Sequence, residues 1–357
     1  MRTMHPTLLI GPADWDAQRM PRAEFQGRLD ALWRDHPQAG GVIVYGDAAD
    51  HGALAYLTNF TPKLEPGIAL LSRSGEAALL VGGGINMIPA AKPLTWVEKM
   101  LPLRSIAKSV PQWAMKLAGG TLLVGGDAMP YAMHGELFAA LGTAPEDATP
   151  TLQSHRRRKS VRELSLIRQA STVPGKAAQA LALARDRNVT DAVIAAEYAA
   201  WQAGAQDVRS LFSLDGGRSL VPFDVPVAEP ADPMQVYLAV RVGGYWAEGF
   251  VMLGAKPNAS LDAAKSALQA AVAQLRPGVT PATLTQTLTK SGTHPAALPA
   301  VIGIGLAVQE DLPLNEPLAA GTVLSLRAGV LGEHSGVIVS ALVAVTETGS
   351  DVLWSAP

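Results

Sequence analysis

Apolar positions in the first 150 residues recur alternately with the period of a helix and with that of a strand. Between Ala23 and His36 they follow helical spacing, and Gly41–Gly46 is a short apolar run bounded by glycine, as in a buried strand. The same two patterns predict further helices over His51–Thr58 and Met133–Leu141, and strands over Gly67–Leu71, Ala77–Val81 and Thr121–Val124. Such alternation predicts an α/β domain that ends near residue 150.

Long helical segments follow. They are predicted over Val161–Ala170, Gly175–Arg187, Thr190–Ala203, Leu261–Leu275 and Pro281–Thr289. Pro174 lies between the first two segments and lacks a backbone N–H group, so we expect a kink or a new helix there. Ser171 or Thr172 is the expected cap of that new helix.

Strand-like runs dominate the rest of the chain. Val236–Val242 and Phe250–Leu253 flank GlyGlyTyr in a hairpin pattern, and further strands are predicted over Val301–Leu306, Val323–Val330 and Val337–Val345. Helices grouped before and between such hairpins predict an α+β domain built on an antiparallel sheet.

The segment AlaProGluAspAlaThrProThr at 144–151 has the composition of a linker between these two patterns. We therefore predict two domains, residues 1–151 and 152–357, which suits a length of 357 residues. The basic cluster His155–Lys159 is interpreted as a solvated interdomain segment with its charges outward. A phosphate site is the alternative.

The composition of the chain limits which partners it is expected to bind and in which compartment it is expected to lie. A formal net charge of −2 gives no electrostatic reason to expect nucleic acid or an anionic membrane. No apolar run approaches the roughly 20 residues that span a bilayer, and the N-terminus lacks the apolar core of a signal peptide. There is no cysteine, which excludes disulfides and thiolate chemistry. We expect a cytoplasmic protein.

Five segments resemble, in order, those of one known group of proteins. They are Asp50–Phe60 (AspHisGlyAlaLeuAlaTyrLeuThrAsnPhe), Arg157–Ala170 (ArgArgLysSerValArgGluLeu and onward), Gly244–Gly249, Ile302–Leu306 (IleGlyIleGlyLeu) and Leu318–Val330. Over nearly its whole length the chain is similar to the two-domain proteins of the pita-bread superfamily, which includes creatinase, prolidase and aminopeptidase P. The resemblance implies a C-terminal pita-bread domain, a smaller α/β N-terminal domain and a homodimer.

Metallopeptidases of this superfamily hold two metal ions through two Asp, one His and two Glu, which are hard oxygen ligands plus imidazole. Carried over position by position, the resemblance puts Tyr237 at the first Asp and Glu248 at the second. It puts Ile302 at the His, and Arg327 and Ser340 at the two Glu. One carboxylate beside an arginine does not hold a dinuclear centre, because a positive charge has replaced a negative ligand. We therefore expect no metal and no other cofactor.

The same resemblance implies which residues line the pocket. The expected floor consists of Tyr237, Arg241, Tyr245, Glu248, Ile302, Arg327 and Ser340. Phe223 takes the place of a histidine that contacts substrate. Glu310 lies in a segment like the superfamily's "H-E-x-P", where it contacts substrate or is a turn carboxylate outside the pocket. His334, in GlyGluHisSerGly, is typical of an exposed loop, with a catalytic role as the alternative.

Three hypotheses on function follow. The first is a metal-independent enzyme that acts on a small polar molecule, with Glu248 as general acid or base and Arg327 as anchor for an anion. Hydrolysis of a C–N bond is its default reaction, by analogy with creatinase alone, and a lyase or isomerase fits equally. The second is an inactive binding protein in which Glu248 and Arg327 form a buried ion pair that fills the vacated metal site. A metallopeptidase comes third.

Overall fold

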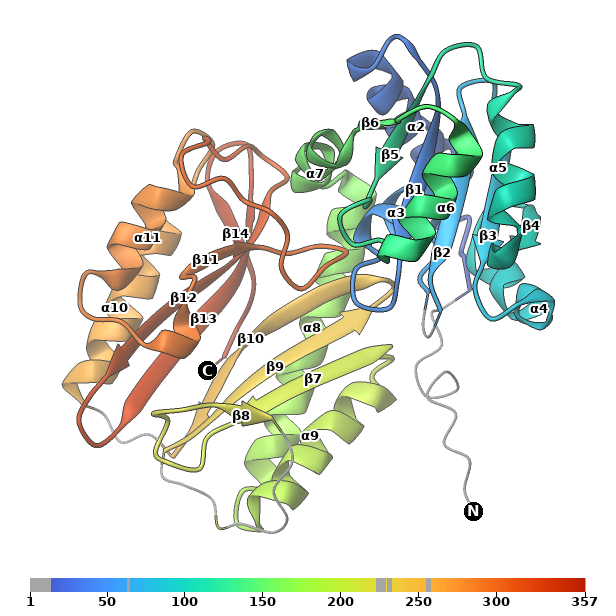
Figure 1. Ribbon diagram of the computed structural model, residues 1–357. Helices are drawn as coiled ribbons and strands as arrows, with labels where there is room; N and C mark the ends of the chain where they lie inside the picture. The colour runs from blue at the N-terminus through green and yellow to red at the C-terminus, as the bar shows by residue number, and fades with distance from the viewer. Residues whose placement is uncertain (1–13, 63–64, 223–228, 230–232, 255–257, 357) are drawn as a thin grey trace, which may run out of the picture. The chain divides into compact units, whose positions relative to one another are not determined.

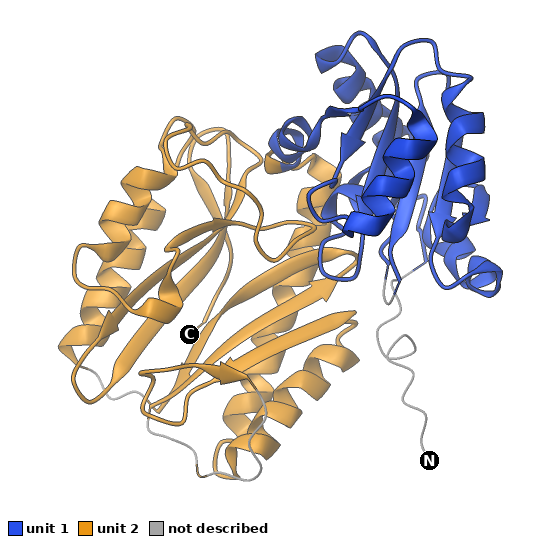
Figure 2. Ribbon diagram, in the orientation of Figure 1, with its two compact units in different colours: residues 1–156 blue, residues 157–357 orange. Residues whose placement is uncertain are grey.

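The computed structural model describes residues 14–62, 65–222, 229, 233–254 and 258–356. The chain forms two compact units, residues 1–156 and residues 157–357 (Figure 2). The expected linker, residues 144–151, is instead structured as β6 (Glu146–Asp147) and the start of α7 (Thr149–Arg157). It is ordered because the Thr149 N–H donates to the Asp147 carboxylate and Ala148 and Leu152 are buried.

Unit 1 is built on one mixed sheet of six strands in the order β4-β3-β2-β1-β5-β6 (Figure 1). The remaining strands are β1 (Ala39–Gly46), β2 (Gly67–Ser72), β3 (Ala77–Val81), β4 (Lys99–Pro102) and β5 (Gly120–Val124). Strands β1, β2 and β3 pair antiparallel, whereas β4, β5 and β6 join parallel to their neighbours. Mixed sheets of this kind occur in α/β domains.

Besides α7, the α-helices in the described part of unit 1 are α2 (Arg22–Asp35), α3 (Gly52–Thr58), α4 (Ile88–Ala91), α5 (Ile106–Ala114) and α6 (Tyr131–Leu141). Helices α5 and α6 pack on one face of the sheet, where Val110 and Leu137 meet Ile43 and Leu80 in a fully buried cluster.

Unit 2 contains two four-stranded antiparallel sheets, in the orders β10-β9-β7-β8 and β11-β12-β13-β14. The first consists of β7 (Asp207–Phe212), β8 (Val221–Pro222), β9 (Met234–Val242) and β10 (Tyr245–Leu253). The second consists of β11 (Val301–Gly303), β12 (Val323–Leu331), β13 (Gly336–Val345) and β14 (Ser350–Ser355). The predicted antiparallel α+β domain is confirmed, although β7, β8 and β14 were not predicted.

Two helical pairs pack against these sheets. Helices α8 (Val161–Leu183) and α9 (Val189–Gln202) lie together beside the first sheet (Figure 1). Helices α10 (Ala259–Gln274) and α11 (Pro281–Thr289) pack on the second, where Ala271 and Leu284 join the buried cluster of β12 and β13. Each helical pair covers one face of its sheet, and the strand residues that alternate with the covered ones lie on the opposite face.

Helix α8 runs through Pro174, so the new helix and new cap that were the alternative to a kink are wrong. Ser160 caps its start in a capping box with Glu163. The hydroxyls of Ser171 and Thr172 donate to carbonyls three residues earlier and cap nothing. Pro174 is itself buried in the apolar stripe of α8, and burial of that stripe offsets the missing hydrogen bond.

The basic cluster His155–Lys159 is less solvated than predicted. Arg156 and Lys159 are buried, and Lys159 pairs with Glu310 at 2.6 Å. Arg157 forms ion pairs with Asp311 and Glu316, both at 2.7 Å. The expectation of outward charges is therefore wrong for these residues, because carboxylates of unit 2 compensate Arg157 and Lys159.

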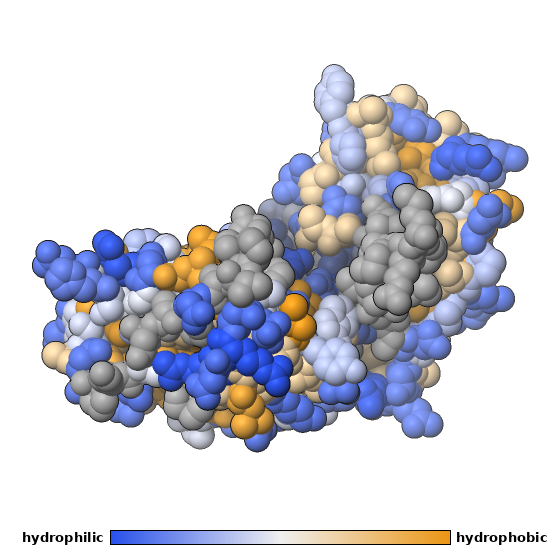
Figure 3. Space-filling model, turned by 90° about the horizontal axis from the view of Figure 1, so that it is seen from below, coloured by the Kyte–Doolittle hydropathy of each residue, from blue (hydrophilic) through white to orange (hydrophobic). Residues whose placement is uncertain are grey.

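Polar residues predominate over the face of the molecule shown in Figure 3, with apolar residues in small separate groups. Among the described residues, no helix is long and apolar enough to cross a membrane.

Candidate functional site

The candidate site lies on the inward face of the first sheet of unit 2. Strand register pairs Tyr237 with Phe250, Ala239 with Glu248, and Arg241 with Trp246. Directly paired residues of antiparallel strands point to the same face. Tyr237, Arg241 and Glu248 therefore share one face of the sheet.

The second sheet supplies the opposite wall. On β12 and β13, Arg327 pairs with Ser340, and Ile302 on β11 pairs with Ser325. The Phe250 N–H donates to the Ser340 hydroxyl at 2.8 Å, which joins β10 to β13 across the boundary between the sheets. Ser340 thus connects the sheets and its hydroxyl oxygen already accepts a hydrogen bond.

Glu248 and Arg327 form a buried ion pair at the centre of this arrangement. Arg327 Nη2 lies 2.6 Å from Glu248 Oε2, and Arg327 Nε lies 3.2 Å from Oε1. The Glu248 side chain is 0% exposed and that of Arg327 is 10% exposed. The two hydrogen bonds make a bidentate contact, which matches the planar guanidinium to both carboxylate oxygens.

Tyr237 completes the cluster. Its ring lies 5.2 Å from that of Phe250 and 5.8 Å from the Arg327 guanidinium carbon. Burial raises the pKa of Tyr237 well above its ordinary value, and the Glu248 carboxylate adds to this by charge and by hydrogen bonding, while Arg327 opposes it. The phenol therefore stays protonated and can donate to Glu248.

A second group of charges lies further along the same face. Arg209 on β7 lies 4.6 Å and Arg241 5.6 Å from the centre of the Trp246 ring. One carboxylate, Asp207, serves both arginines at 3.8 and 3.9 Å. Burial lowers the pKa of Arg241, Asp207 opposes the shift, and Arg209 contributes to it.

Sequence reasoning missed Arg209 because β7 was not recognised as a strand. Its pairing places Asp207 opposite Arg241 and Arg209 opposite Ala239, so both belong to the inward face. No local signal marked this strand, because AspValArgSerLeuPhe at 207–212 shows no regular alternation of apolar and polar residues.

Tyr245 is not part of the pocket floor, contrary to the prediction. It points away from Glu248, and its hydroxyl donates to Glu163 at 3.0 Å near the start of α8. Tyr245 and Glu248 are three residues apart on one strand, and an odd spacing puts side chains on opposite faces.

Of the other predicted site residues, two are buried, one is exposed and one lies outside the described part of the chain. Ile302 is buried. Glu310 is a buried carboxylate held by Lys159 and by the Leu306 N–H at 3.0 Å, so its contacts are those of a structural group. His334 is exposed in the loop between β12 and β13, as its context predicts. Phe223 lies outside the described residues.

One buried histidine was not considered from the sequence. His294 Nε2 lies 2.8 Å from the Gly217 carbonyl, and its Nδ1 accepts from the Ala296 N–H at 3.1 Å. These partners fix the tautomer with the proton on Nε2. Burial lowers the pKa of His294, which keeps the ring neutral.

The residues present do not fit a divalent metal. Within the described part of the chain, no three His, Cys, Asp or Glu side chains are grouped so that they can hold an ion. Both oxygens of Glu248 accept from a guanidinium, which itself occupies the adjoining space. A cation there meets one carboxylate and one fixed positive charge.

Comparison with known proteins defines the fold. No family model and no curated protein matches the sequence. Among solved structures, the prolidase from Pyrococcus horikoshii OT3 matches with a TM-score of 0.74 and 17% identity, covering 92% of this chain and 97% of that one. The X-Pro aminopeptidase from Thermotoga maritima MSB8 matches with 0.77 and 18%, covering 93% and 97%.

Zinc-substituted Escherichia coli aminopeptidase P in complex with product matches with a TM-score of 0.74 and 15% identity, over 96% and 95% of the two chains. The fold is therefore that of the two-domain pita-bread proteins. This confirms the resemblance seen in the sequence, and at such identities the likeness establishes the fold alone.

Proposed function

We propose that unit 2 binds a small anionic molecule on its arginine-bearing face, without a divalent metal centre. The observation that carries this is the sharing of Asp207 by Arg209 and Arg241 beside Trp246. Arg209, Arg241 and Asp207 carry two positive charges and one negative charge between them, which favours an anion beside the exposed Arg209. The Arg209 side chain is 49% exposed and therefore available to a carboxylate, which guanidinium binds in bidentate geometry.

In this proposal the Glu248–Arg327 pair is structural. Both carboxylate oxygens already accept hydrogen bonds, and Glu248 is fully buried. A general base needs an oxygen within reach of the proton that it removes. The pair instead fills the place where the resemblance puts the metal ions, and it keeps two polar groups satisfied in the interior.

The second candidate is a metal-independent enzyme that acts on a small polar molecule by acid–base chemistry, by default the hydrolysis of a C–N bond. The contact between Tyr237 and Glu248 favours it. A substrate anion that drew Arg327 toward itself would free one Glu248 oxygen, while Tyr237 held the other. A metallopeptidase is not proposed, because the donor set does not fit. A homodimer is proposed on the resemblance alone, and a cytoplasmic location on the composition of the chain.

Calorimetry with small carboxylates, their amides and the corresponding amines tests the binding proposal. We expect carboxylates to bind, amides to bind at least about tenfold more weakly, and Arg209→Gln to weaken carboxylate binding about tenfold. The matched control is Arg218→Gln, which alters an exposed loop arginine. Equal binding by carboxylate and amide, or equal affinity of the two variants, would contradict the proposal.

Metal analysis and product analysis separate the alternatives. Purified protein is expected to carry divalent metal well below one equivalent, and stoichiometric Mn, Zn or Co would contradict the loss of the site. Ligands found by calorimetry are then incubated with protein and followed by mass spectrometry. Turnover that Glu248→Gln abolishes would establish the enzyme, whereas binding without product supports the binding protein.

A further inference from the structure

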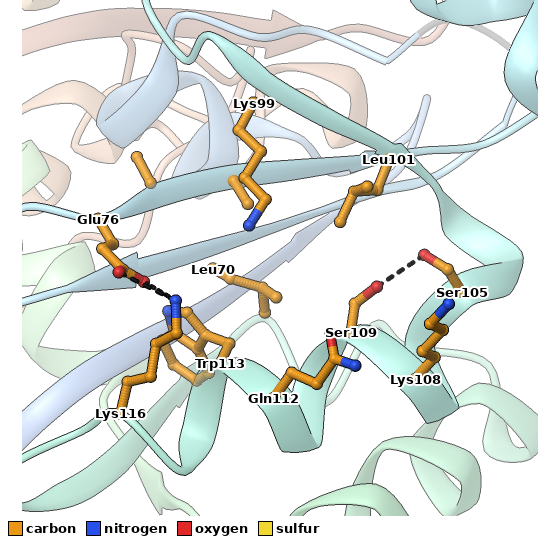
Figure 4. A pocket seen from close by; sticks show the side chains of 12 residues that line it. Leu70, Glu76, Lys99, Leu101, Ser105, Lys108, Ser109, Gln112, Trp113 and Lys116 are labelled. Carbon is orange, nitrogen blue, oxygen red and sulfur yellow. Dashed lines mark hydrogen bonds and ion pairs between the residues drawn. The ribbon is translucent and has the colours of Figure 1, made fainter.

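A pocket of about 620 Å³ lies in unit 1 between α5 and the edge of the sheet formed by β3 and β4 (Figure 4). In Figure 4, Lys99 and Leu101 on β4 point across this space toward α5, and Gln112 and Trp113 lie on the helix side. The volume is within the range of small-molecule sites, about 300–1,000 Å³. All of its lining belongs to unit 1, so it is separate from the arginine-bearing face of unit 2.

The floor of the pocket is apolar and rigidly packed. Leu70, Ala78 and Trp113 line it and are 1%, 6% and 6% exposed. Leu70, Ala78 and Trp113 also belong to the core cluster beneath α5. Such a floor accepts an aromatic or aliphatic body, because burial of apolar surface is the main favourable contribution to binding there.

The rim of the pocket is cationic. It holds three lysines and one glutamate, a net charge of +2 (3 − 1). Lys116 pairs with Glu76, at 3.1 and 3.2 Å to its two oxygens. Lys99 and Lys108 have no ion pair within the described part of the chain. Two ammonium groups without carboxylate partners above an apolar floor match an anionic head on an apolar body.

Hydrogen-bonding groups also line the pocket. Ser109 donates to the Ser105 hydroxyl at 3.0 Å, and Ser105 donates onward to the Pro102 carbonyl at 2.7 Å. The indole Nε1 of Trp113 is buried and has no hydrogen-bond partner among the described residues. A buried donor without an acceptor is unfavourable, and a bound acceptor group or water relieves it.

We propose that this pocket binds a small amphiphilic anion, with its apolar body on Leu70, Ala78 and Trp113 and its head between Lys99 and Lys108. The head is a carboxylate or a phosphate, since lysine binds either as a point charge. The proposal does not depend on the function assigned to unit 2.

Calorimetry on the full chain tests it with octanoate, octyl phosphate, octanamide and 3-phenylpropanoate. We expect the anions to bind and octanamide to bind at least about tenfold more weakly. Comparison of octanoate with octyl phosphate identifies the preferred head group. The double variant Lys99→Gln/Lys108→Gln is expected to lose about tenfold in affinity, while the control Lys92→Gln, an exposed lysine outside the pocket, retains it.

A second variant tests the cavity itself. Gln112 is exposed on α5 and lines the pocket, so Gln112→Trp fills the space without disturbing the core and is expected to abolish binding. The proposal is overturned if no anion of the panel binds, if octanamide binds as well as octanoate, or if the lysine double variant binds like Lys92→Gln. It is also overturned if Arg209→Gln removes this binding, because the ligand would then lie in unit 2.

Discussion

A substitution that removes either partner of the Glu248–Arg327 ion pair is expected to lower the stability of unit 2 strongly. Arg327→Met leaves a carboxylate that is 0% exposed without the guanidinium 2.6 Å away. Removing one partner of a buried pair costs about 3–5 kcal/mol. Because Tyr237 still hydrogen-bonds to Glu248, we expect the lower part of that range. Glu248→Leu should cost somewhat less, since the arginine side chain left behind is 10% exposed and reaches water more easily.

The double variant Glu248→Leu/Arg327→Met removes both charges and conserves volume. Replacement of a buried pair by apolar residues is often neutral, so we expect it within about 1 kcal/mol of wild type. The double-mutant cycle then gives a coupling of about 3 kcal/mol or more, the size expected for groups in direct contact.

Hydrogen exchange read by mass spectrometry on peptides from β10 and β12 is the appropriate assay. It reports the local opening free energy of the strands that carry the pair, and it does not require the two units to unfold together. Two results would refute this account of the pair. One is an opening free energy within about 1 kcal/mol of wild type in both single variants, and the other is a loss in the double variant equal to the sum of the two single losses.

Two further predictions concern other buried positions. Because the pKa of His294 is lowered in the folded state, its contribution to stability is complete above the unfolded value of about 6.5 and is lost as pH falls through the lower folded value. Urea titrations from pH 7.5 to 5 should show a flatter loss of stability for His294→Gln than for wild type, and parallel curves would contradict this. Gly249→Ala puts a Cβ 2.0 Å from the Trp354 ring and should destabilise by more than about 2 kcal/mol. Gly135→Ala, in open space on α6, should stabilise by about 0.5–1 kcal/mol, and thermal melts of both variants check the contrast.

Most helices and strands were predictable from local pattern. Helix α11 begins at Pro281 after the capping Thr280 and ends at Thr289, as the sequence predicts. Strand β7 was missed because its residues are mostly half-buried and no apolar alternation marks it. The continuity of α8 through Pro174 depends on tertiary burial, which local propensity does not contain.

The site was partly predictable as well. The position-by-position resemblance predicted that Glu248 and Arg327 line the same pocket, and the structure shows them in contact. The position of Tyr245 was predictable from the sequence, because its odd spacing of three residues from Glu248 puts the two side chains on opposite faces of one strand. The contribution of Arg209 depended on knowing that β7 pairs with β9, a long-range contact that no local pattern specifies.

The hydrogen bonds of Glu248, Arg327 and Ser340 where the two sheets meet limit which single substitutions the site tolerates. Arg327→Glu alone would place a second carboxylate against the fully buried Glu248, and two such charges repel. Ser340→Glu alone would remove the hydroxyl that accepts from the Phe250 N–H. Each single substitution toward the ligand set that the resemblance implies therefore loses stability before any ion is held. A divalent metal site at this junction would require several of these positions to change together.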